Sequence, residues 1–454
     1  MDVPPKRMER AIVIGASISG LLVARVLANH FNQVSVVERD ILPPLGEPRK
    51  GVPQGRHVHV LLARGRELLE GFFPGLIQEL VEHGAQAGDF SQTVRWFSGG
   101  AYTRNFPSGL TSVQVSRPLL EGAIYRRLCA LPNVTILENH DATGLLTTPT
   151  GAGPDVRVTG VRVVDRSGSA PVEKQLDAKL VVDAGGRGAR SLAWLDSLGY
   201  PRPTEALIKM GLTYTTRVFR RVPEHAQGHS PVVIMASFNN RRSAAMLAVE
   251  GSRWIVSLSG YLGDAAPTDL AGFIEFARSL DAPDCYQIIK NAEPLGEASQ
   301  YKYPASQRRY FEKLTRFPEG LLVSGDALCS FNPIYGQGMT TAASEAALLD
   351  ECLRANGAAN RGSLRRRFFR RAGRLLDSPW SISAGNDLAY PEVEGERSPV
   401  MGLVGRYLAR LLLAARQDAV LNVAFQRVTN LIDPPASLFR PKILLRVLFK
   451  SLKS

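Results

Sequence analysis

Apolar residues near the beginning of the chain form two short runs that are separated by a longer segment of mixed character. The runs at 11–14 and 34–37 have the length of buried strands, and the segment 21–30 between them has the length and composition of a helix. A turn over residues 15–20, with a glycine at each end, joins the first run to the helix. The pattern therefore predicts a βαβ unit, which is a building block of parallel sheets.

A second group of runs lies in the middle of the chain, where residues alternate between apolar and polar or stay apolar over a few positions. These runs have the length of strands and are bounded by glycines and turns, at 92–97, 102–106, 211–220, 232–237, 244–249 and 254–258. They predict a mostly antiparallel sheet. Helical spacing predicts helices at 273–280 and 285–290, and proline-bearing stretches near 42–53 and 378–398 predict loops.

A third apolar run, at 321–323, predicts another buried strand, which a Gly325-Asp326 turn follows. A loop rich in proline and glycine then leads into an alanine-rich helix predicted at about 340–353. Glycines let the backbone approach a ligand, and a helix start offers free N–H groups to an electron-rich group. Asp326 lies where a carboxylate can accept hydrogen bonds from sugar or ribityl hydroxyls.

The last fifth of the chain combines apolar residues at helical spacing with an excess of positive charge. Residues 361–454 hold 17 Lys and Arg and 7 Asp and Glu, so they carry ten of the thirteen net positive charges of the protein. The spacing predicts two basic amphipathic helices, around Leu408 and Val447. Such helices can cap a neighbouring domain, lie on an anionic membrane surface, or form a lid over an apolar substrate.

The turn at 15–20 differs from the dinucleotide-binding pattern G-x-G-x-x-G at one position, because Ser17 replaces the middle glycine. That glycine normally allows close approach of a pyrophosphate, whereas serine is small and can itself donate to a phosphate. Glu38 follows the second strand about 20 residues past the glycines, where an acidic residue binds ribose hydroxyls. Framed by two strands and a helix, the turn predicts nucleotide binding rather than an ordinary connection.

Four motifs in order make the chain resemble the FAD-dependent monooxygenases of the para-hydroxybenzoate hydroxylase fold. They span residues 11–353 and are the βαβ unit with Glu38, the helix start Ser116-Arg117-Pro118-Leu119-Leu120-Glu121, the segment Val181–Ser191, and Gly325-Asp326 with the Pro333 and Gly336-Gln337-Gly338 loop. The third motif departs from the family pattern, because Ala184 is inserted between Asp183 and Gly185. The chain looks most similar to the branch that holds squalene epoxidase and bacterial polyether epoxidases.

The resemblance implies an α/β fold with a Rossmann-like FAD-binding domain, an inserted mostly antiparallel β-sheet substrate domain and a C-terminal helical region. The FAD-binding domain is expected at 1–90, 110–200 and 300–360, the substrate domain at 91–109 and 201–299, and the helical region at 361–454. The residues expected to bind FAD are Gly15, Ala16, Ser17, Ser19, Gly20, Glu38, Arg39, Arg117, Ala142, Asp183, Gly325, Asp326, Pro333, Gly336, Gln337 and Gly338.

The resemblance also implies the chemistry, because the cofactor carries out the oxygen and electron transfer while the protein supplies position and polarity. FAD would be reduced by NADPH or NADH, directly or through a flavin or ferredoxin reductase. Reduced FAD would react with O2 to give a C4a-hydroperoxide that inserts one oxygen into a hydrophobic substrate. Epoxidation of an alkene, or hydroxylation of a polyketide- or terpenoid-like compound, is the expected outcome. The absence of a second G-x-G-x-x-G unit favours a transient nicotinamide site or an external reductase.

The loop after the βαβ unit contains Arg49, Arg56, His57 and His59, and in the resembled fold it passes close to the flavin. Arg49 and His57 are therefore the candidates for a catalytic or substrate-placing role, and a structural hydrogen bond is expected for His59. The two histidines alternate, so an extended backbone turns both to one side. No third ligand cluster accompanies them, so no metal is expected.

The remaining composition excludes several classes of protein. Four scattered cysteines without a C-x-x-C pattern fit packing roles in a reducing compartment. The N-terminal residues are polar, and no run reaches the roughly 18 apolar residues of a membrane span. A cytoplasmic protein is expected, with peripheral membrane contact through the C-terminal region as an addition. No basic patch interleaved with aromatic residues points to nucleic acid.

Other flavin chemistries stay open. A flavin halogenase of this fold is disfavoured because no W-x-W-x-I-P segment occurs. An enzyme similar to geranylgeranyl reductase would saturate prenyl double bonds, and the basic apolar tail suits it, although its aromatic-Pro substrate motif is not evident. An FAD dehydrogenase or oxidase, and a flavin-binding scaffold without enzymatic activity, are further alternatives.

Overall fold

The centre of the fold is a parallel sheet, which the computed structural model shows within the described residues 7–151, 153–223, 231–355 and 362–451. Its strands lie in the order β18-β12-β1-β2-β8. They are β1 (Met8–Ile14), β2 (Phe31–Val37), β8 (Val134–Leu137), β12 (Leu180–Asp183) and β18 (Leu321–Val323). Ala11, Ile12 and Val13 are fully buried, as expected for parallel strands covered on both faces.

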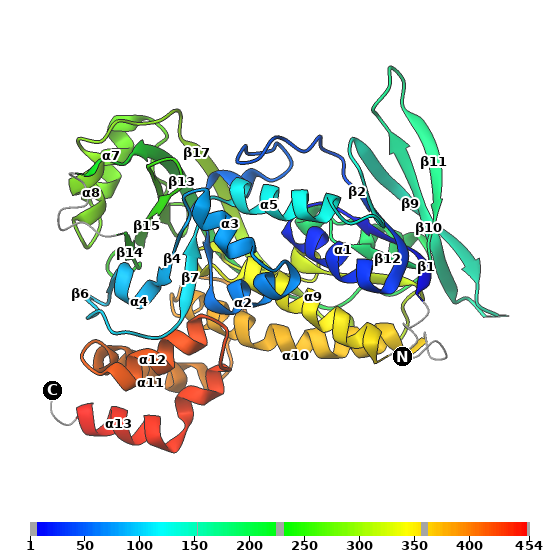
Figure 1. Cartoon of the computed structure of the whole chain (residues 1–454). Helices are drawn as coiled ribbons and strands as arrows, with labels where there is room; N and C mark the ends of the chain where they lie inside the picture. Colours follow the sequence, from blue (N-terminus) through cyan, green and yellow to red (C-terminus); the bar gives the residue numbers. More distant parts are fainter. Residues whose placement is uncertain (1–6, 152, 224–230, 356–361, 452–454) are drawn as a thin grey trace, which may run out of the picture.

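Long helices surround this sheet and share its hydrophobic core (Figure 1). They are α1 (Ile18–His30), α5 (Arg117–Cys129), α9 (Gly338–Arg354) and α10 (Gly362–Asp387). α1 and α9 contact each other, and α10 packs on α9. α1 directly follows β1, so its N-terminus lies at the carboxyl edge of the sheet, whereas a loop that contains β19 connects β18 to α9.

Two small antiparallel sheets accompany the parallel one. β9 (His140–Pro149), β10 (Val156–Asp165) and β11 (Val172–Asp177) form a sheet at one side of the molecule, drawn in cyan-green in Figure 1. β3 (Val60–Leu61), β7 (Thr111–Gln114) and β4 (Gln86–Asp89) form the other. Neither of these sheets was predicted, although β10 shows an alternation of apolar and polar residues.

The largest sheet has eight strands and lies on the opposite side from β9–β11 (Figure 1). In spatial order they are β19 (Cys329–Ser330), β17 (Ser299–Arg309), β13 (Glu205–Arg220), β16 (Arg253–Gly260), β15 (Arg242–Val249), β14 (Val232–Ile234), β5 (Arg95–Ser98) and β6 (Ala101–Tyr102). Pairing is antiparallel except between β14 and β5. α7 (Leu270–Arg278) and α8 (Asp284–Ile289) cover one face, around a core of their own.

The C-terminal helices α11 (Met401–Ala415), α12 (Ala419–Thr429) and α13 (Pro441–Ser451) form a separate small bundle, drawn in red in Figure 1. Their own hydrophobic cluster includes Leu411, Leu421 and Val447. The remaining α-helices of the described residues are α2 (Ala63–Phe72), α3 (Leu76–Glu82), α4 (Phe90–Thr93) and α6 (Ser191–Ser197). Short 3-10 turns lie at Pro53–Arg56, Gly186–Gly188, Phe311–Lys313, Gly325–Ala327, Pro333–Tyr335 and Pro435–Phe439.

Three sequence predictions about elements were wrong. Residues 90–93 form the helical turn α4, which Asp89 caps by accepting a hydrogen bond from Ser91 N, so the strand predicted at 92–97 begins only at Arg95. The strand predicted at 102–106 ends at Tyr102. Residues 378–387, predicted as loop, continue α10 with Pro379 inside the helix, because α10 is held by its packing on the core.

One strand of the eight-stranded sheet crosses residue 300, where a domain bound was expected, and the domain bounds stay a prediction. β17 was not predicted, and it pairs with β13 over the whole range 299–309, so these residues belong to the eight-stranded sheet. The strand run therefore continues to about residue 309 before the chain returns to the parallel sheet at β18.

Candidate active site

A cavity of about 610 Å³ lies between the carboxyl edge of the parallel sheet and the eight-stranded sheet. The sheet register explains its position, because Ile14 pairs with both Val37 and Asp183, and Asp183 pairs with Val323. Four strand ends therefore meet at one level, and the turns that follow them form one wall. Open α/β sheets bind ligands outside the carboxyl ends of their strands.

Most of the predicted site residues line this cavity. They are Gly15, Ser17, Ser19, Glu38, Arg39, Arg49, His57, Arg117, Ala142, Asp183, Gly325, Asp326, Pro333, Gly336 and Gly338. Segments that are hundreds of residues apart in the sequence are thus brought to a single site. The cofactor contacts assigned to these residues remain predictions.

Ala16, Gly20 and Gln337 do not line the cavity. Ala16 N donates instead to Glu38 Oε2 at 2.7 Å. A side chain at Gly20 would meet Gly15 O at 1.8 Å, so this glycine lets the helix start pack against the turn. The Gln337 side chain is 2 % exposed at the start of α9, buried within the protein.

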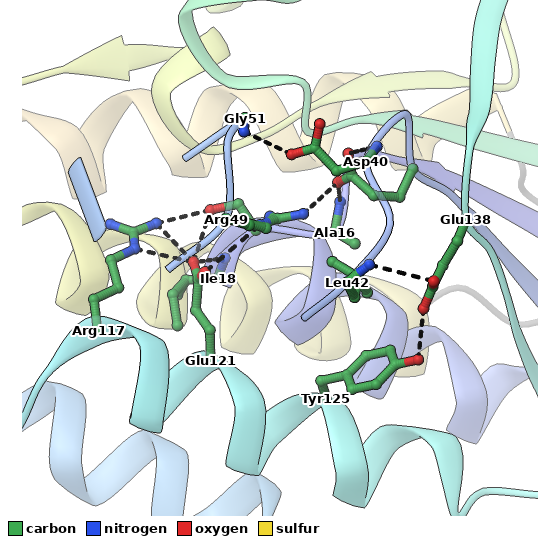
Figure 2. Close-up of polar contacts among 12 residues, drawn as sticks. Ala16, Ile18, Asp40, Leu42, Arg49, Gly51, Arg117, Glu121, Tyr125 and Glu138 are labelled. Atoms are coloured by element: carbon green, nitrogen blue, oxygen red, sulfur yellow. Dashed lines mark hydrogen bonds and ion pairs between the residues drawn. The ribbon is translucent and has the colours of Figure 1, made fainter. Parts of the chain in front are cut away.

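A charged network connects the end of β2 with the loop that follows it (Figure 2). Glu38 Oε2 lies 2.9 Å from Arg49 Nη1, and Glu38 Oε1 accepts a hydrogen bond from Asp40 N at 3.0 Å. Burial opposes ionisation of Glu38, but Arg49 and the backbone N–H groups outweigh it, so the pKa of Glu38 is lowered. Glu38 is thus a charged carboxylate at the expected ribose-binding position.

Glu121 occupies the start of α1, where an anion would be expected (Figure 2). Its Oε1 accepts hydrogen bonds from Ile18 N at 3.1 Å and from Ser17 Oγ at 3.0 Å. Arg117 Nη2 donates to Ser17 Oγ at 2.7 Å and contacts Glu121 at 2.9 Å. A phosphate at this helix start would share these donors with Glu121, which the sequence analysis placed in a motif without giving it a role.

The two aspartates at the strand ends differ in their partners. Asp183 is fully buried and accepts hydrogen bonds from Gly185 N and Ser191 N, both at 3.0 Å, so it holds its own turn together. Asp326 faces the cavity, and no described residue donates to its carboxylate. Burial raises the pKa of Asp326, while Arg117 and Arg187 lower it. Asp326 is therefore the aspartate that is available to ligand hydroxyls.

Two buried residues that support this wall were missed. Glu345 on α9 accepts hydrogen bonds from Ser324 Oγ at 2.8 Å and Gly325 N at 2.7 Å. Asp387, at the end of α10, accepts from Asn332 Nδ2 at 2.8 Å and Tyr335 Oη at 2.9 Å. Both carboxylates therefore fasten the turns that line the cavity. An acidic residue among the apolar residues of the predicted helix at 340–353 was the only signal for Glu345, and Asp387 lay in a predicted loop without any signal.

The eight-stranded sheet supplies the opposite wall through one face of its strands. Residues at alternate positions share this face: Tyr214 on β13, Ser257 and Ser259 on β16, Ser243, Ala245 and Leu247 on β15, Val233 on β14 and Trp96 on β5. Met235 and Tyr301 extend it. The wall is thus mostly apolar and aromatic, with a short row of hydroxyl groups.

His57 and His59 lie against this wall, and both are uncharged at neutral pH. His57 Nδ1 is 2.8 Å from Thr216 Oγ1, and its ring lies edge-on to Tyr214 with centroids 4.4 Å apart. Burial, and then Arg56, lower the pKa of His57 to about 4. Burial, and then Arg117, lower the pKa of His59 to about 3. The described residues contain no group of three or more His, Cys, Asp or Glu placed to hold a metal ion.

The C-terminal bundle also lines the cavity, and a lid over the substrate was one of the alternatives for these helices. Gln426, Thr429 and Asn430 of the α12 region line it. Asn430 Oδ1 accepts hydrogen bonds from Ala63 N at 3.0 Å and Ser112 Oγ at 3.2 Å, so it ties the bundle to the start of α2 and to β7. In the part of the chain that the structure describes, no helix is long and apolar enough to span a membrane.

The walls of the cavity fit an elongated dinucleotide such as FAD. Gly15 has a φ of +95°, and a Cβ there would meet Ala184 O at 2.8 Å, so only glycine fits at this position of the turn. At Gly186 and Gly338, which line the cavity, a Cβ would meet nothing within 4 Å and would project into open space. Together with the carboxylates of Glu38 and Asp326, these surfaces provide close backbone approach and acceptors for hydroxyls.

Comparison with known proteins gives the family. Residues 8–365 match the model of a family described as an FAD binding domain. Protein Rv3254 of Mycobacterium tuberculosis is 33% identical over 94% of this chain and 90% of its own length. Kynurenine 3-monooxygenase of Salinispora tropica is 26% identical over 77% of this chain and 74% of its own. The structure of p-nitrophenol 4-monooxygenase PnpA of Pseudomonas putida superposes with a TM-score of 0.64 at 17% identity, covering 95% of this chain and 99% of that one, which shows the fold. The chain therefore belongs to the FAD-binding domain family and is a flavoprotein.

Proposed function

We propose that this protein binds FAD in the cavity and transfers one atom of O2 to a hydrophobic substrate, while the other atom leaves as water. NADPH or NADH would supply the two electrons, directly or through a flavin or ferredoxin reductase. The observation that carries the proposal is the continuity of the cavity, which joins the carboxyl edge of the parallel sheet to an apolar sheet face. A cofactor at the first wall would thus lie next to a substrate at the second.

The residues of the chain would bind the cofactor, orient the substrate and exclude water. Bound FAD would supply the activation of oxygen. Glu38 and Asp326 would accept hydrogen bonds from cofactor hydroxyls, and the start of α9 would place positive dipole near the flavin. The apolar face around Trp96, Leu247 and Met235 would keep the reacting region dry.

For the substrate we propose a compound of polyketide or terpenoid type that is epoxidised or hydroxylated. The mostly apolar sheet wall supports a lipophilic ligand. The kynurenine 3-monooxygenase relatives support oxygenation as the reaction type. Kinship with squalene epoxidase stays a prediction based on the sequence motifs.

Reduction or dehydrogenation of a lipophilic substrate is the second candidate, because a nonpolar cavity beside FAD serves these reactions too. The test is to incubate the FAD-loaded protein with NADPH, ¹⁸O2 and a panel of lipophilic alkenes and phenols. We expect substrate-dependent NADPH consumption and a product that carries one labelled oxygen. A product that has gained or lost two hydrogens without label would favour the second candidate. A protein that retains no FAD would refute both.

We also propose that the C-terminal bundle contacts an anionic membrane surface. Among the described residues, nine of the fourteen large apolar side chains that are exposed lie within 400–449: Val400, Leu403, Leu412, Leu413, Val420, Phe439, Leu445, Leu448 and Phe449. Both acidic residues of the bundle, Asp418 and Asp433, are already paired with arginines. Positive charge is therefore left in excess beside exposed apolar side chains, which favours an anionic lipid surface over a neutral partner.

Sedimentation with lipid vesicles tests this contact. We expect the FAD-loaded protein to bind vesicles that contain phosphatidylglycerol and to be released by salt or by the double substitution Leu445→Ser with Phe449→Ser. Phe238→Ser is the matched control, because Phe238 is 70% exposed but lies outside the bundle. Equal binding to neutral and anionic vesicles, or no binding to either, would contradict the proposal.

A further inference from the structure

We propose that His59 determines which substrates bind, because its Nε2 atom accepts a hydrogen bond from an O–H or N–H group of the ligand. This inference rests on the proposed function only insofar as the cavity is the substrate site. A structural hydrogen bond was expected for His59, and this bond leaves the other ring nitrogen available to a ligand.

The first step is the position of the ring proton. His59 Nδ1 lies 2.9 Å from the backbone oxygen of His57. A carbonyl oxygen only accepts hydrogen bonds, so Nδ1 must be the donor and must carry the proton. In the neutral ring, Nε2 is then left with a free lone pair.

The second step is the charge of the ring. The side chain is half-buried in the cavity wall, where loss of solvent disfavours the charged ring, and the cationic Arg117 disfavours a second positive charge further. The hydrogen bond to the His57 carbonyl acts in the opposite direction but is weaker than burial. The ring is therefore neutral over the physiological range, and Nε2 acts as an acceptor rather than a donor.

The third step is what Nε2 faces. His59 lines the cavity, and in the ranges that the structure describes no hydrogen bond to its Nε2 is made by a protein group. Nε2 is exposed to the cavity, so water can donate to it. A ligand that brings an N–H or O–H group to this position replaces that hydrogen bond, whereas an ether or an apolar group displaces the water and leaves Nε2 without a donor. An ionised carboxylate would meet the lone pair unfavourably.

The fourth step is rigidity. His57 Nδ1 is bonded to Thr216 Oγ1, which lies 2.5 Å from Ser257 Oγ, and Val58 N donates to the same Ser257 Oγ at 3.2 Å. Thr216 and Ser257 are paired neighbours on β13 and β16. Residues 57–59 thus form a strap that is fastened to the sheet at successive residues. The His57 carbonyl, and with it the His59 ring, is therefore held in one orientation.

The ligand class follows from these contacts. It is an apolar compound with a neutral hydroxyl or amino group, such as a phenol, an aniline or an alcohol, placed next to the row of serine hydroxyls on the sheet. Ser243 Oγ and Ser259 Oγ already bond each other at 2.7 Å, so they compete less for the ligand than the free Nε2 of His59.

Binding of two matched probes to the oxidised, FAD-loaded protein tests the inference. 1-Naphthol carries an O–H group and 1-methoxynaphthalene does not, and each is titrated while the flavin absorption spectrum is followed. We expect 1-naphthol to bind roughly three- to tenfold more tightly, which is the value of one hydrogen bond. His59→Leu should remove this preference, and His59→Gln, which keeps an acceptor oxygen, should restore part of it.

His83→Leu is the matched control, because His83 Nδ1 also bonds a backbone oxygen, that of Glu79 at 2.8 Å, but the residue is exposed on α3. A wild-type protein that does not distinguish the two probes, whether it binds both or neither, would overturn the inference. So would a preference that survives His59→Leu.

A second measurement needs no ligand. Nitrogen-15 NMR of histidine-labelled holoprotein, with the His59 signals identified by their loss in His59→Gln, reports which ring nitrogen carries the proton. We expect the Nδ1–H form throughout pH 6–8, and an Nε2–H form or a charged ring at pH 7 would refute the argument. Neither experiment involves oxygen transfer, so a failure of the proposed reaction and a failure of this inference are distinguishable.

Discussion

Glu345 offers a direct test of how the wall of the cavity is held together. Its side chain is 1 % exposed on α9, and Oε2 accepts the hydrogen bonds of Ser324 and Gly325. Its Oε1 has no hydrogen-bond partner among the described residues, and no cationic side chain forms an ion pair with it there. Burial therefore raises the pKa of Glu345 to about 7, although the two hydrogen bonds act against this.

The sign and size of the effect on stability follow from linkage. The ordinary pKa is 4.5, so between pH 4.5 and about 7 the folded state binds the proton while the unfolded state has lost it. Stability is therefore fully present below pH 4.5 and declines as the pH rises through 7. The shift corresponds to about 3 kcal/mol at alkaline pH. Glu345→Gln keeps an acceptor and cannot ionise, so it should remove this loss.

Urea unfolding of the FAD-loaded protein, followed by tryptophan fluorescence at pH 5 and pH 8, measures the effect. We expect Glu345→Gln to exceed the wild type by as much as about 3 kcal/mol at pH 8 and by less than about 1 kcal/mol at pH 5. Glu173→Gln is the control, because Glu173 is exposed on β11. The free energy of unfolding could instead change by the same amount between pH 5 and pH 8 in the wild type and in Glu345→Gln. Glu345 would then be ionised over this whole range, and the reasoning would be wrong.

Three further predictions concern the cavity. Asp326→Ala should weaken FAD retention by about tenfold or more, since a charged acceptor is lost. Ultrafiltration measures the FAD that stays with the protein, and normal retention would argue against Asp326 as an acceptor for FAD hydroxyls. Asp387→Ala should lower the free energy of unfolding in urea by about 3 kcal/mol and speed FAD release, because Asn332, Tyr261 and Tyr335 lose their buried acceptor. Asp387→Asn, which keeps an acceptor oxygen, should keep much of the stability. Gly15→Ala should reduce thermal stability and FAD content more than Gly46→Ala, because both have positive φ but only Gly15 would clash, with Ala184 O.

The sequence by itself determined the parts of the fold whose signals are local. The βαβ unit at 8–37 and the strand, turn and helix at 321–354 were predicted within a few residues. Parallel strands are buried on both faces, so they are short apolar runs, and glycine turns between them are forced by backbone geometry. Among the predicted residues that line the cavity, Gly15, Glu38 and Asp183 lie at the carboxyl ends of parallel strands, which is why their sequence position already placed them.

Helix and strand bounds farther from such signals depended on contacts. Pro379 predicted a loop, but the buried face of α10 keeps the helix intact through Asp387. β17 forms because β13 provides a partner along its whole length. A short run of alternating residues is compatible with several structures, and its neighbour in the sheet decides among them.

Only the tertiary structure decided which side chains meet at the cavity. Asp387 reaches a loop 52 residues away in sequence, Asn430 caps a helix start 367 residues away, and His59 depends on hydroxyl groups from two strands of another sheet. Each is a buried polar group that must find a partner, and sequence spacing carries no information about a partner so distant. The roles of these residues therefore arise from packing, whereas the glycines and acidic residues at strand ends follow from the chain itself.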